Sequence, residues 1–228
     1  QFYNTIKPRI KQESSLHIIP NFVDTDLYVT ESSTKLPAEF LSKPGFINML
    51  YAGNIGLAQE WDLVLNVAKE IRNESITIWI IGEGVKKEFV KSQIEKHNLS
   101  NIKLLPYQDR KFMPAINLFA DFHFIAMDKS MENEGFPSKV YSIMASARPM
   151  VIVSSENTPI ISFLNETNTS LLVTDHSLSG FKNAVLKLAE DKELRISLGA
   201  NGRQIIEESY TKERVIDQYT DLFEQLCK

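Results

Sequence analysis

The stretch Met127-Asp-Lys-Ser-Met-Glu-Asn-Glu-Gly-Phe-Pro-Ser-Lys-Val-Tyr-Ser-Ile-Met-Ala-Ser-Ala-Arg-Pro-Met-Val-Ile-Val153 decides how the chain is organised. A polar loop that carries Glu134 comes first, and Pro137 then suits the first turn of a helix, where its missing N–H costs nothing. Apolar residues at helical spacing predict a helix over 137–147, and an apolar strand follows. The stretch thus predicts a loop that opens onto a helix N-terminus, whose unpaired N–H groups and partial positive charge favour a phosphate.

Outward from this stretch, apolar runs alternate with amphipathic segments. We predict strands at 47–52, 76–81, 102–105, 122–127, 149–153 and 170–173. We predict helices at 58–72, 84–97, 110–119, 137–147, 158–165, 178–190, 191–198, 200–208 and 212–226. Continuously apolar strands separated by helices indicate an α/β fold with a doubly wound parallel sheet of about six strands. Ligands bind such sheets at the carboxyl ends of the strands, near the switch point.

The residues before the sheet read as a connector. Residues 1–14 predict the end of a helix with a kink at Pro8, and residues 16–19 predict a short apolar strand. The spacing of Asp24 and Asp26 would suit the oxygen ligands of a divalent metal, but turn-forming aspartates explain it better.

The composition of the chain excludes several classes of function. The 228 residues carry a net charge of −4 and no Lys/Arg block, which argues against a nucleic-acid surface. Cys227 is the one cysteine, so an internal disulfide and a cysteine-rich metal site are excluded. The sequence has no apolar run of about 18 residues and no signal peptide. It begins at Gln1 within a helical pattern, so we expect a piece of a longer protein.

Two glycine pairs follow the first two strands. Gly53 and Gly56 follow the first, and Gly82 and Gly84 follow the second. Neither pair has the G-x-G-x-x-G spacing, so NAD is not expected, and tight turns explain each pair as well as a ligand does. Tyr107, after the third strand, either stacks on a base or covers the end of the sheet.

Charged residues near the quoted loop are the strongest functional candidates. Glu134 and Lys139 flank the predicted helix start, although solvated loop charges are the alternative interpretation. The four histidines show no ligand spacing and are predicted to be surface or packing residues.

Taken together, these stretches resemble the C-terminal, donor-binding half of a GT-B glycosyltransferase of family 4, also called group 1. The resemblance covers nearly the whole chain and lies in the order and spacing of its motifs. These are Ile18-Ile-Pro-Asn-Phe-Val-Asp-Thr-Asp-Leu-Tyr28, Tyr51-Ala-Gly-Asn-Ile-Gly56, Ile80-Ile-Gly-Glu-Gly84, the stretch from Glu134 to Pro149, and Leu194 to Tyr210.

The resemblance implies a Rossmann-like fold and a retaining transfer of a sugar from a nucleotide diphosphate sugar to a saccharide or lipid-linked acceptor. It further implies a bacterial enzyme of cell-surface polysaccharide synthesis, such as capsule or O-antigen, in the cytoplasm or at the inner face of the membrane. No metal and no cofactor are expected besides the nucleotide sugar, which is a co-substrate.

The resemblance also assigns residue roles. Glu134 would contact hydroxyls of the donor sugar. Lys139 and the amides of residues 136–138 would stabilise the departing diphosphate, because preorganised N–H donors and a cation act best there. The donor-binding residues it implies are Gly53, Asn54, Gly56, Gly82, Gly84, Tyr107, Gly135, Phe136, Pro137, Ser138 and Ser142.

The sequence departs from the family in three places. Ser142 stands where a carboxylate usually holds the ribose, Asn54 and Gln59 stand where Arg and Lys often hold the diphosphate, and the N-terminal domain is missing. The expected divisions are the end of that domain and the start of the linker at 1–20, a linker at 21–46, the nucleotide-sugar domain at 47–210, and a crossing helix at 211–228. We expect this chain alone to be inactive. A non-catalytic nucleotide-sugar-binding module and a sugar-nucleotide 2-epimerase remain alternatives.

Overall fold

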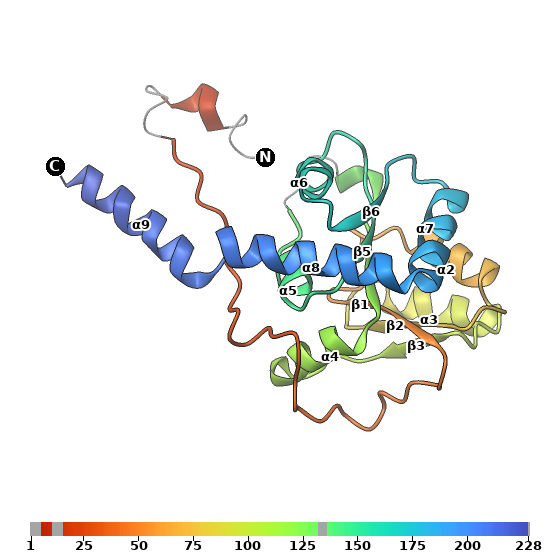
Figure 1. Ribbon diagram of the computed structural model, residues 1–228. Helices are drawn as coiled ribbons and strands as arrows, with labels where there is room; N and C mark the ends of the chain where they lie inside the picture. The colour runs from red at the N-terminus through yellow and green to blue at the C-terminus, as the bar shows by residue number, and fades with distance from the viewer. Residues whose placement is uncertain (1–5, 11–15, 132–135, 228) are drawn as a thin grey trace.

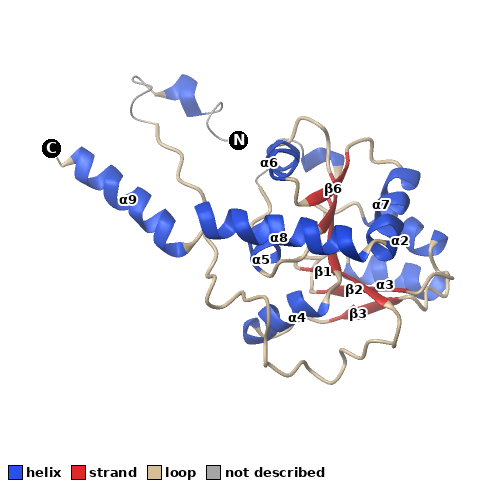
Figure 2. Cartoon of the chain, in the orientation of Figure 1, coloured by secondary structure: helices blue, strands red, loops and turns tan. Residues whose placement is uncertain are grey.

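A computed structural model of the chain describes residues 6–10, 16–131 and 136–227. One six-stranded parallel sheet forms its centre, with helices on both faces (Figures 1 and 2). The strand order is β3-β2-β1-β4-β5-β6, so the chain winds outward in both directions from the point between β1 and β4. The prediction of a doubly wound parallel α/β sheet is confirmed.

The elements lie close to the predicted ranges. The strands are β1 (Ile47–Ala52), β2 (Ile76–Ile81), β3 (Ile102–Leu105), β4 (Phe122–Ala126), β5 (Met150–Val153) and β6 (Ser170–Val173). The α-helices are α2 (Trp61–Glu70), α3 (Lys87–Lys96), α4 (Met113–Phe119), α5 (Lys139–Ala145), α6 (Pro159–Thr167), α7 (Leu178–Glu190), α8 (Lys192–Ser209) and α9 (Lys212–Leu226). Short 3₁₀ turns are η1 (Lys7–Arg9), η3 (Arg110–Phe112) and η4 (Lys129–Met131).

Alternate residues of the strands feed the cores on the two faces of the sheet. Met49 and Tyr51 of β1 pack in one cluster with residues of α2, α3 and α7. Leu50, between them, points to the other face and packs with Trp79 and α4. A second cluster on that face joins β5 to α5, α6 and Ile206 of α8. Because both faces are covered, the strands are apolar throughout, as the sequence requires.

Helix α8 corrects a prediction, since one continuous helix replaces the two expected at 191–198 and 200–208. Gly199 and Gly202 lie inside it, and glycine usually weakens a helix. A Cβ at Gly199 would overlap the carbonyl oxygen of Ala147, the residue that ends the α5 turn. This glycine therefore serves close packing rather than a helix break.

The segment before the sheet also differs from the prediction. Residues 16–19 form no strand, and Ile18 is 70% exposed where the segment runs beside α9. Val23 alone makes a bridge, to Thr211. The Asp24 carboxylate accepts hydrogen bonds from the backbone N–H groups of Asp26 and Leu27, which is the geometry of a turn-forming aspartate.

The expected helix end is described only in part. Residues 7–9 form a single 3₁₀ turn with a proline in its first turn, and residues 1–5 and 11–14 of the prediction lie outside the described residues.

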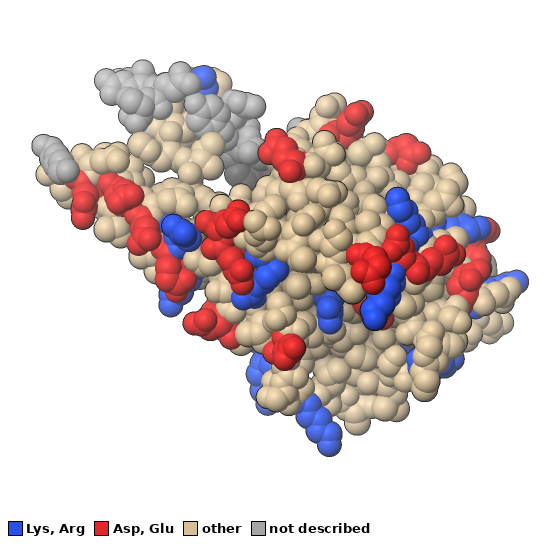
Figure 3. Space-filling model, in the orientation of Figure 1, with Lys and Arg blue, Asp and Glu red and all other residues tan. Residues whose placement is uncertain are grey.

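Helix α9 extends away from the sheet (Figure 1). Val215 is its buried residue, whereas Ile216, Tyr219 and Phe223 are exposed. Acidic side chains gather along this helix on the face that Figure 3 shows. In the described ranges, no helix is both long and apolar enough to cross a membrane.

Candidate functional site

The carboxyl ends of β1 and β2 are joined through their glycine turns. The N–H of Ile55 donates to the carbonyl of Glu83 at 2.7 Å, and the N–H of Lys86 donates to the carbonyl of Ile55 at 2.9 Å. Gly82 has φ +150°, and a Cβ there would overlap the carbonyl oxygen of Gly53. A Cβ at Gly84 would likewise overlap the carbonyl oxygen of Ile55. Packing between the two turns therefore accounts for Gly82 and Gly84, and their role toward a ligand stays a prediction.

Gly53 is different, because a side chain from another element occupies the space beside it. The Nζ atom of Lys139 lies 2.5 Å from the position that a Cβ at Gly53 would take. Lys139 is the first residue of α5, which follows β4, so the contact spans the switch point between β1 and β4. The sequence predicted both residues as site residues, and the structure brings them together at the edge where ligands bind such sheets.

The Lys139 ammonium is partly buried on an aromatic face. Its Nζ lies 3.9 Å from the centroid of the Tyr51 ring, a cation–π contact. It makes no hydrogen bond or ion pair with any residue in the described part of the chain. Burial lowers the pKa of Lys139 to about 8. A cation held this way is suited to receive an anion.

Two aromatic side chains hold the first glycine turn. The Tyr51 hydroxyl donates to the carbonyl of Asn54 at 2.7 Å, and Trp61 Nε1 donates to the carbonyl of Gly56 at 2.9 Å. The two rings meet edge to face, with centroids 5.2 Å apart. Burial, with a smaller contribution from nearby Tyr107, raises the pKa of Tyr51, so its phenol stays a donor. The turn and the lysine thus share one rigid support.

Other predicted residues near this turn have more local roles. The Asn54 side chain lies between the two glycine turns, against Gly56 and Gly84. Gln59 donates to the carbonyl of Ala58 and pairs with Met127 in a single antiparallel bridge. Tyr107 is 62% exposed after β3, so its ring is free to stack on a ligand. Its role in base binding stays a prediction.

The start of α5 differs from the predicted helix start, while the predicted role of the amides of residues 136–138 stays a prediction. The helix begins at Lys139 rather than Pro137, with Ser138 as its N-cap, and it has seven residues. The N–H groups of Val140 and Tyr141 bond back to Pro137 and Ser138. Since this first turn uses its own N–H groups and Pro137 has none, the helix end offers fewer free donors than expected. The Lys139 ammonium is therefore the main positive group that this part of the chain offers to an anion.

The remaining predicted residues fall in three groups. Glu134 and Gly135 lie outside the described residues. Phe136 packs against Tyr141 and Phe163, with ring centroids 5.3 Å away in each case. Ser142 lies one turn after Lys139, and its hydroxyl donates to the Lys139 carbonyl at 2.9 Å. The Phe136 ring is thus packed and the Ser142 hydroxyl proton is engaged, and the roles of both residues toward a ligand stay predictions.

The sequence missed a polar network at the same edge of the sheet. His176 Nδ1 lies 2.7 Å from Glu60 Oε2, and its Nε2 lies 3.3 Å from the Ser155 hydroxyl. Through these two contacts His176, in the loop after β6, links the loop after β5 to the start of α2. Its side chain is 3% exposed. Among the other histidines, His123 is 2% exposed and so is a packing residue as predicted, and this burial lowers its pKa to about 3.

Within the described ranges, no group of three or more His, Cys, Asp or Glu side chains is placed to hold a metal ion. The fold defines an α/β protein whose candidate site, at the carboxyl ends of β1 and β4, contains the switch-point residue Lys139.

Comparison with known families identifies the class. The family described as "Glycosyl transferases group 1" matches residues 32–205, so the chain belongs to it. The expectation of a GT-B glycosyltransferase is confirmed at this level.

Curated relatives are distant and longer. The chain is 28% identical over 112 residues to the putative colanic acid biosynthesis glycosyl transferase WcaI of Escherichia coli K12, covering 49% of this chain and 28% of that protein. It is 24% identical over 165 residues to the poly(ribitol-phosphate) alpha-N-acetylglucosaminyltransferase of Staphylococcus aureus, covering 71% of this chain and 32% of that protein. The chain thus spans about a third of the length of these two relatives.

Solved structures share the fold. Anabaena Alr3699/HepE in complex with UDP and glucose has a TM-score of 0.77 at 13% identity, over 97% of this chain and 60% of that one. S. aureus TarM, in a complex with UDP and other ligands, has a TM-score of 0.72 at 19% identity, over 97% of this chain and 42% of that chain. A C-terminal domain of a glycosyl transferase group 1 family protein (LpcC) of Francisella tularensis has a TM-score of 0.62 at 16% identity, over 83% of this chain and 99% of that chain.

Proposed function

We propose that this chain binds the nucleotide diphosphate sugar of a retaining family 4 glycosyltransferase at the carboxyl ends of β1 and β4. The observation that carries the proposal is the partly buried Lys139 ammonium beside Gly53, on the face of Tyr51. Glycine at 53 lets backbone and cation approach the same space, and the diphosphate would take the free side of the cation.

The chemistry follows from the charge that develops during sugar transfer. When the bond from the sugar to the diphosphate breaks, negative charge grows on the leaving oxygen. A cation fixed before the reaction stabilises that charge without reorganising. The pKa of about 8 keeps most Lys139 side chains protonated near neutral pH, and a bound diphosphate would raise it further. We assign Lys139 to the leaving group, and Glu134 to the donor sugar hydroxyls.

UDP is the first nucleotide to test. HepE and TarM, which share this fold, were solved with UDP. Relatives named for colanic acid and lipopolysaccharide core biosynthesis support a role in bacterial cell-surface polysaccharide synthesis. The acceptor, saccharide or lipid-linked, would be bound by a part of the protein outside these residues, at the cytoplasmic face of the membrane.

The proposal includes a donor domain at 47–210 and a crossing helix at 211–228; the LpcC domain, 99% of which is covered by this chain, shares the fold.

A thermal-shift screen of UDP, GDP and ADP tests donor binding. Ligand at about 100 times Kd stabilises a protein by about 2.7 kcal/mol, or roughly 5–10 °C for a chain of this size. Lys139→Met should remove most of the shift, whereas Lys91→Met, at an exposed position of α3, should leave it unchanged. Equal shifts in wild type and Lys139→Met would place the diphosphate elsewhere.

A transfer assay tests the division of labour. This chain with UDP-sugar and acceptor should at most hydrolyse donor slowly, because catalysis needs both substrates held at reacting distance. Adding the remaining part of the protein should restore transfer. Efficient transfer by this chain alone would contradict the proposed half-enzyme. Donor binding without transfer, even in the whole protein, would favour the non-catalytic module.

A further inference from the structure

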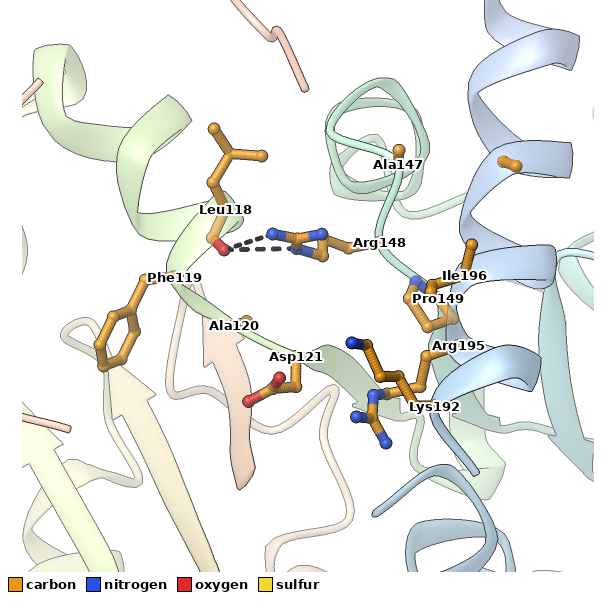
Figure 4. Close-up of a pocket in the computed structure, with 11 residues that line it drawn as sticks. Leu118, Phe119, Ala120, Asp121, Ala147, Arg148, Pro149, Lys192, Arg195 and Ile196 are labelled. Carbon is orange, nitrogen blue, oxygen red and sulfur yellow. Dashed lines mark hydrogen bonds between the residues drawn. The ribbon is translucent and has the colours of Figure 1, made fainter. Parts of the chain in front are cut away.

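A cavity of about 330 Å³ lies at the opposite edge of the sheet from Lys139, where β4 and β5 begin. Helix α4 borders one side and the first turns of α8 border the other (Figure 4). Its charged lining residues are Asp121, Arg148, Lys192 and Arg195. Three cations face one carboxylate, so the cavity has an excess of positive charge.

Both arginines are fixed by helix ends. Arg148 donates from Nε and Nη2 to the carbonyl of Leu118, in the last turn of α4, at 3.3 and 2.7 Å. Arg195 donates from Nη1 to the carbonyls of Leu188 and Ala189, in the last turn of α7. These bonds use one side of each guanidinium. Nη1 of Arg148 and both Nε and Nη2 of Arg195 make no hydrogen bond within the described part of the chain.

The one carboxylate is already engaged. Asp121 Oδ2 accepts from the backbone N–H of Asn48 at 2.8 Å, which ties it to the start of β1. Burial lowers the pKa of Arg148, and the nearby Arg195 lowers it too while Asp121 raises it. Like charges in a partly buried space are costly unless an anion joins them.

Lys192 is an exposed residue in the lining of the cavity. It is the first residue of α8, where a cation opposes the partial positive charge of the helix end. It makes no hydrogen bond or ion pair with a described residue, and it lines the cavity from α8, as Arg195 does (Figure 4). Capping of α4 and α7 accounts for the two arginines, but it does not account for this lysine.

We propose that this cavity is a second anion site, distinct from the donor site, which binds the phosphate group of a phosphorylated molecule. Two fixed guanidinium groups offer the planar N–H donors that suit phosphate oxygens, and Lys192 adds a mobile point charge. Apolar side chains continue from the cations, including Leu118 and Ile196, and Ile196 is 54% exposed. The remainder of the ligand would lie on this apolar wall. Such a phosphate comes from a small soluble molecule or from a lipid headgroup.

The test is a titration of inorganic phosphate into the chain, followed by ¹⁵N NMR in a Lys139→Met background that removes phosphate binding at the donor site. Sodium chloride at matched ionic strength is the reference. Signals of Arg148, Lys192 and Arg195 should shift and saturate with phosphate but not with chloride. Lys192→Glu should weaken the affinity at least about tenfold, since a charge-assisted hydrogen bond is lost and a repulsive charge is added.

The variant is safe for folding, because an acidic residue is favourable in the first turn of a helix. Lys91→Glu makes the same change of net charge outside the cavity and should leave the affinity unchanged. Equal weakening by both variants, shifts that do not saturate, or shifts that chloride reproduces would overturn the proposal.

Flotation with phosphatidylcholine vesicles, with and without phosphatidylglycerol, distinguishes the two sources of phosphate. Binding that requires phosphatidylglycerol and Lys192 would assign a lipid headgroup. Saturable phosphate binding without vesicle binding would assign a soluble ligand. Binding of neither phosphate nor vesicles would refute the site.

Discussion

Replacing Lys139 with Met should stabilise the chain while removing its donor site. Met is of similar length and apolar, so it can lie on the Tyr51 ring where the lysine stem lies now. The ammonium, by contrast, is held in a partly buried position without an anionic partner among the described residues. A protein that keeps a charge at such a position gives up stability there, and this is measurable.

The magnitude follows from the pKa. A drop from 10.5 to about 8, at about 1.4 kcal/mol per unit, corresponds to about 3.5 kcal/mol of preference for the neutral lysine. The cation–π contact with Tyr51 offsets about 2 kcal/mol of this in the charged form. The net expectation is that Lys139→Met is about 1.5 kcal/mol more stable at neutral pH, or about 3–6 °C in Tm.

The pH dependence has a definite sign. Between about pH 8 and pH 10.5 the unfolded chain keeps the lysine proton that the native chain has lost, so wild-type stability rises with pH relative to the variant. The destabilisation is fully present below about pH 8 and is relieved as pH approaches 10.5. Urea unfolding of both proteins across this range measures it. A variant that is less stable than wild type by a pH-independent amount would refute the reasoning.

Three further perturbations follow from the described contacts. Ala147 has φ 50° in the turn that ends α5, so Ala147→Gly should raise stability by about 1 kcal/mol, and a lower Tm would contradict this. Tyr51→Leu should weaken UDP binding more than Tyr51→Phe does, because the Phe variant keeps a ring under the ammonium and loses only the hydrogen bond to the Asn54 carbonyl. Equal UDP affinities of the two variants in calorimetry would exclude a role for the cation–π contact. Glu60→Gln should lower the free energy of unfolding by about 1–2 kcal/mol through loss of the charged partner of His176, and no change in urea unfolding would mean that the pair contributes nothing to stability.

The sheet could be predicted from the sequence because its six strands are buried on both faces. Each therefore appears as a short, continuously apolar run, and the alternating helices impose parallel connections. The errors lie where a local signal had a tertiary cause. We predicted separate helices at 191–198 and 200–208, but α8 is continuous, and the close approach of Ala147 explains the glycine between them. Residues 16–19 run beside α9 and join no sheet.

The candidate site could be predicted only residue by residue. The helix-start pattern predicted Lys139, and the turn after the first strand predicted Gly53, but no local signal indicated that they touch. That contact depends on β1 and β4 being neighbours, which the order of winding decides. The same holds for Glu60 and His176, which are 116 residues apart. Tyr51 was missed because an aromatic residue in a buried strand is usually read as core, and here it is both core and support for a cation.

The central claim is that Lys139 and Gly53 form the diphosphate site, and calorimetric titration of UDP into wild type, Lys139→Met and Lys91→Met tests it most directly. Loss of a charge-assisted contact worth about 1.5–3 kcal/mol predicts that Lys139→Met weakens UDP at least about tenfold, while Lys91→Met leaves its affinity unchanged. UDP that binds wild type and Lys139→Met with equal affinity would contradict the account.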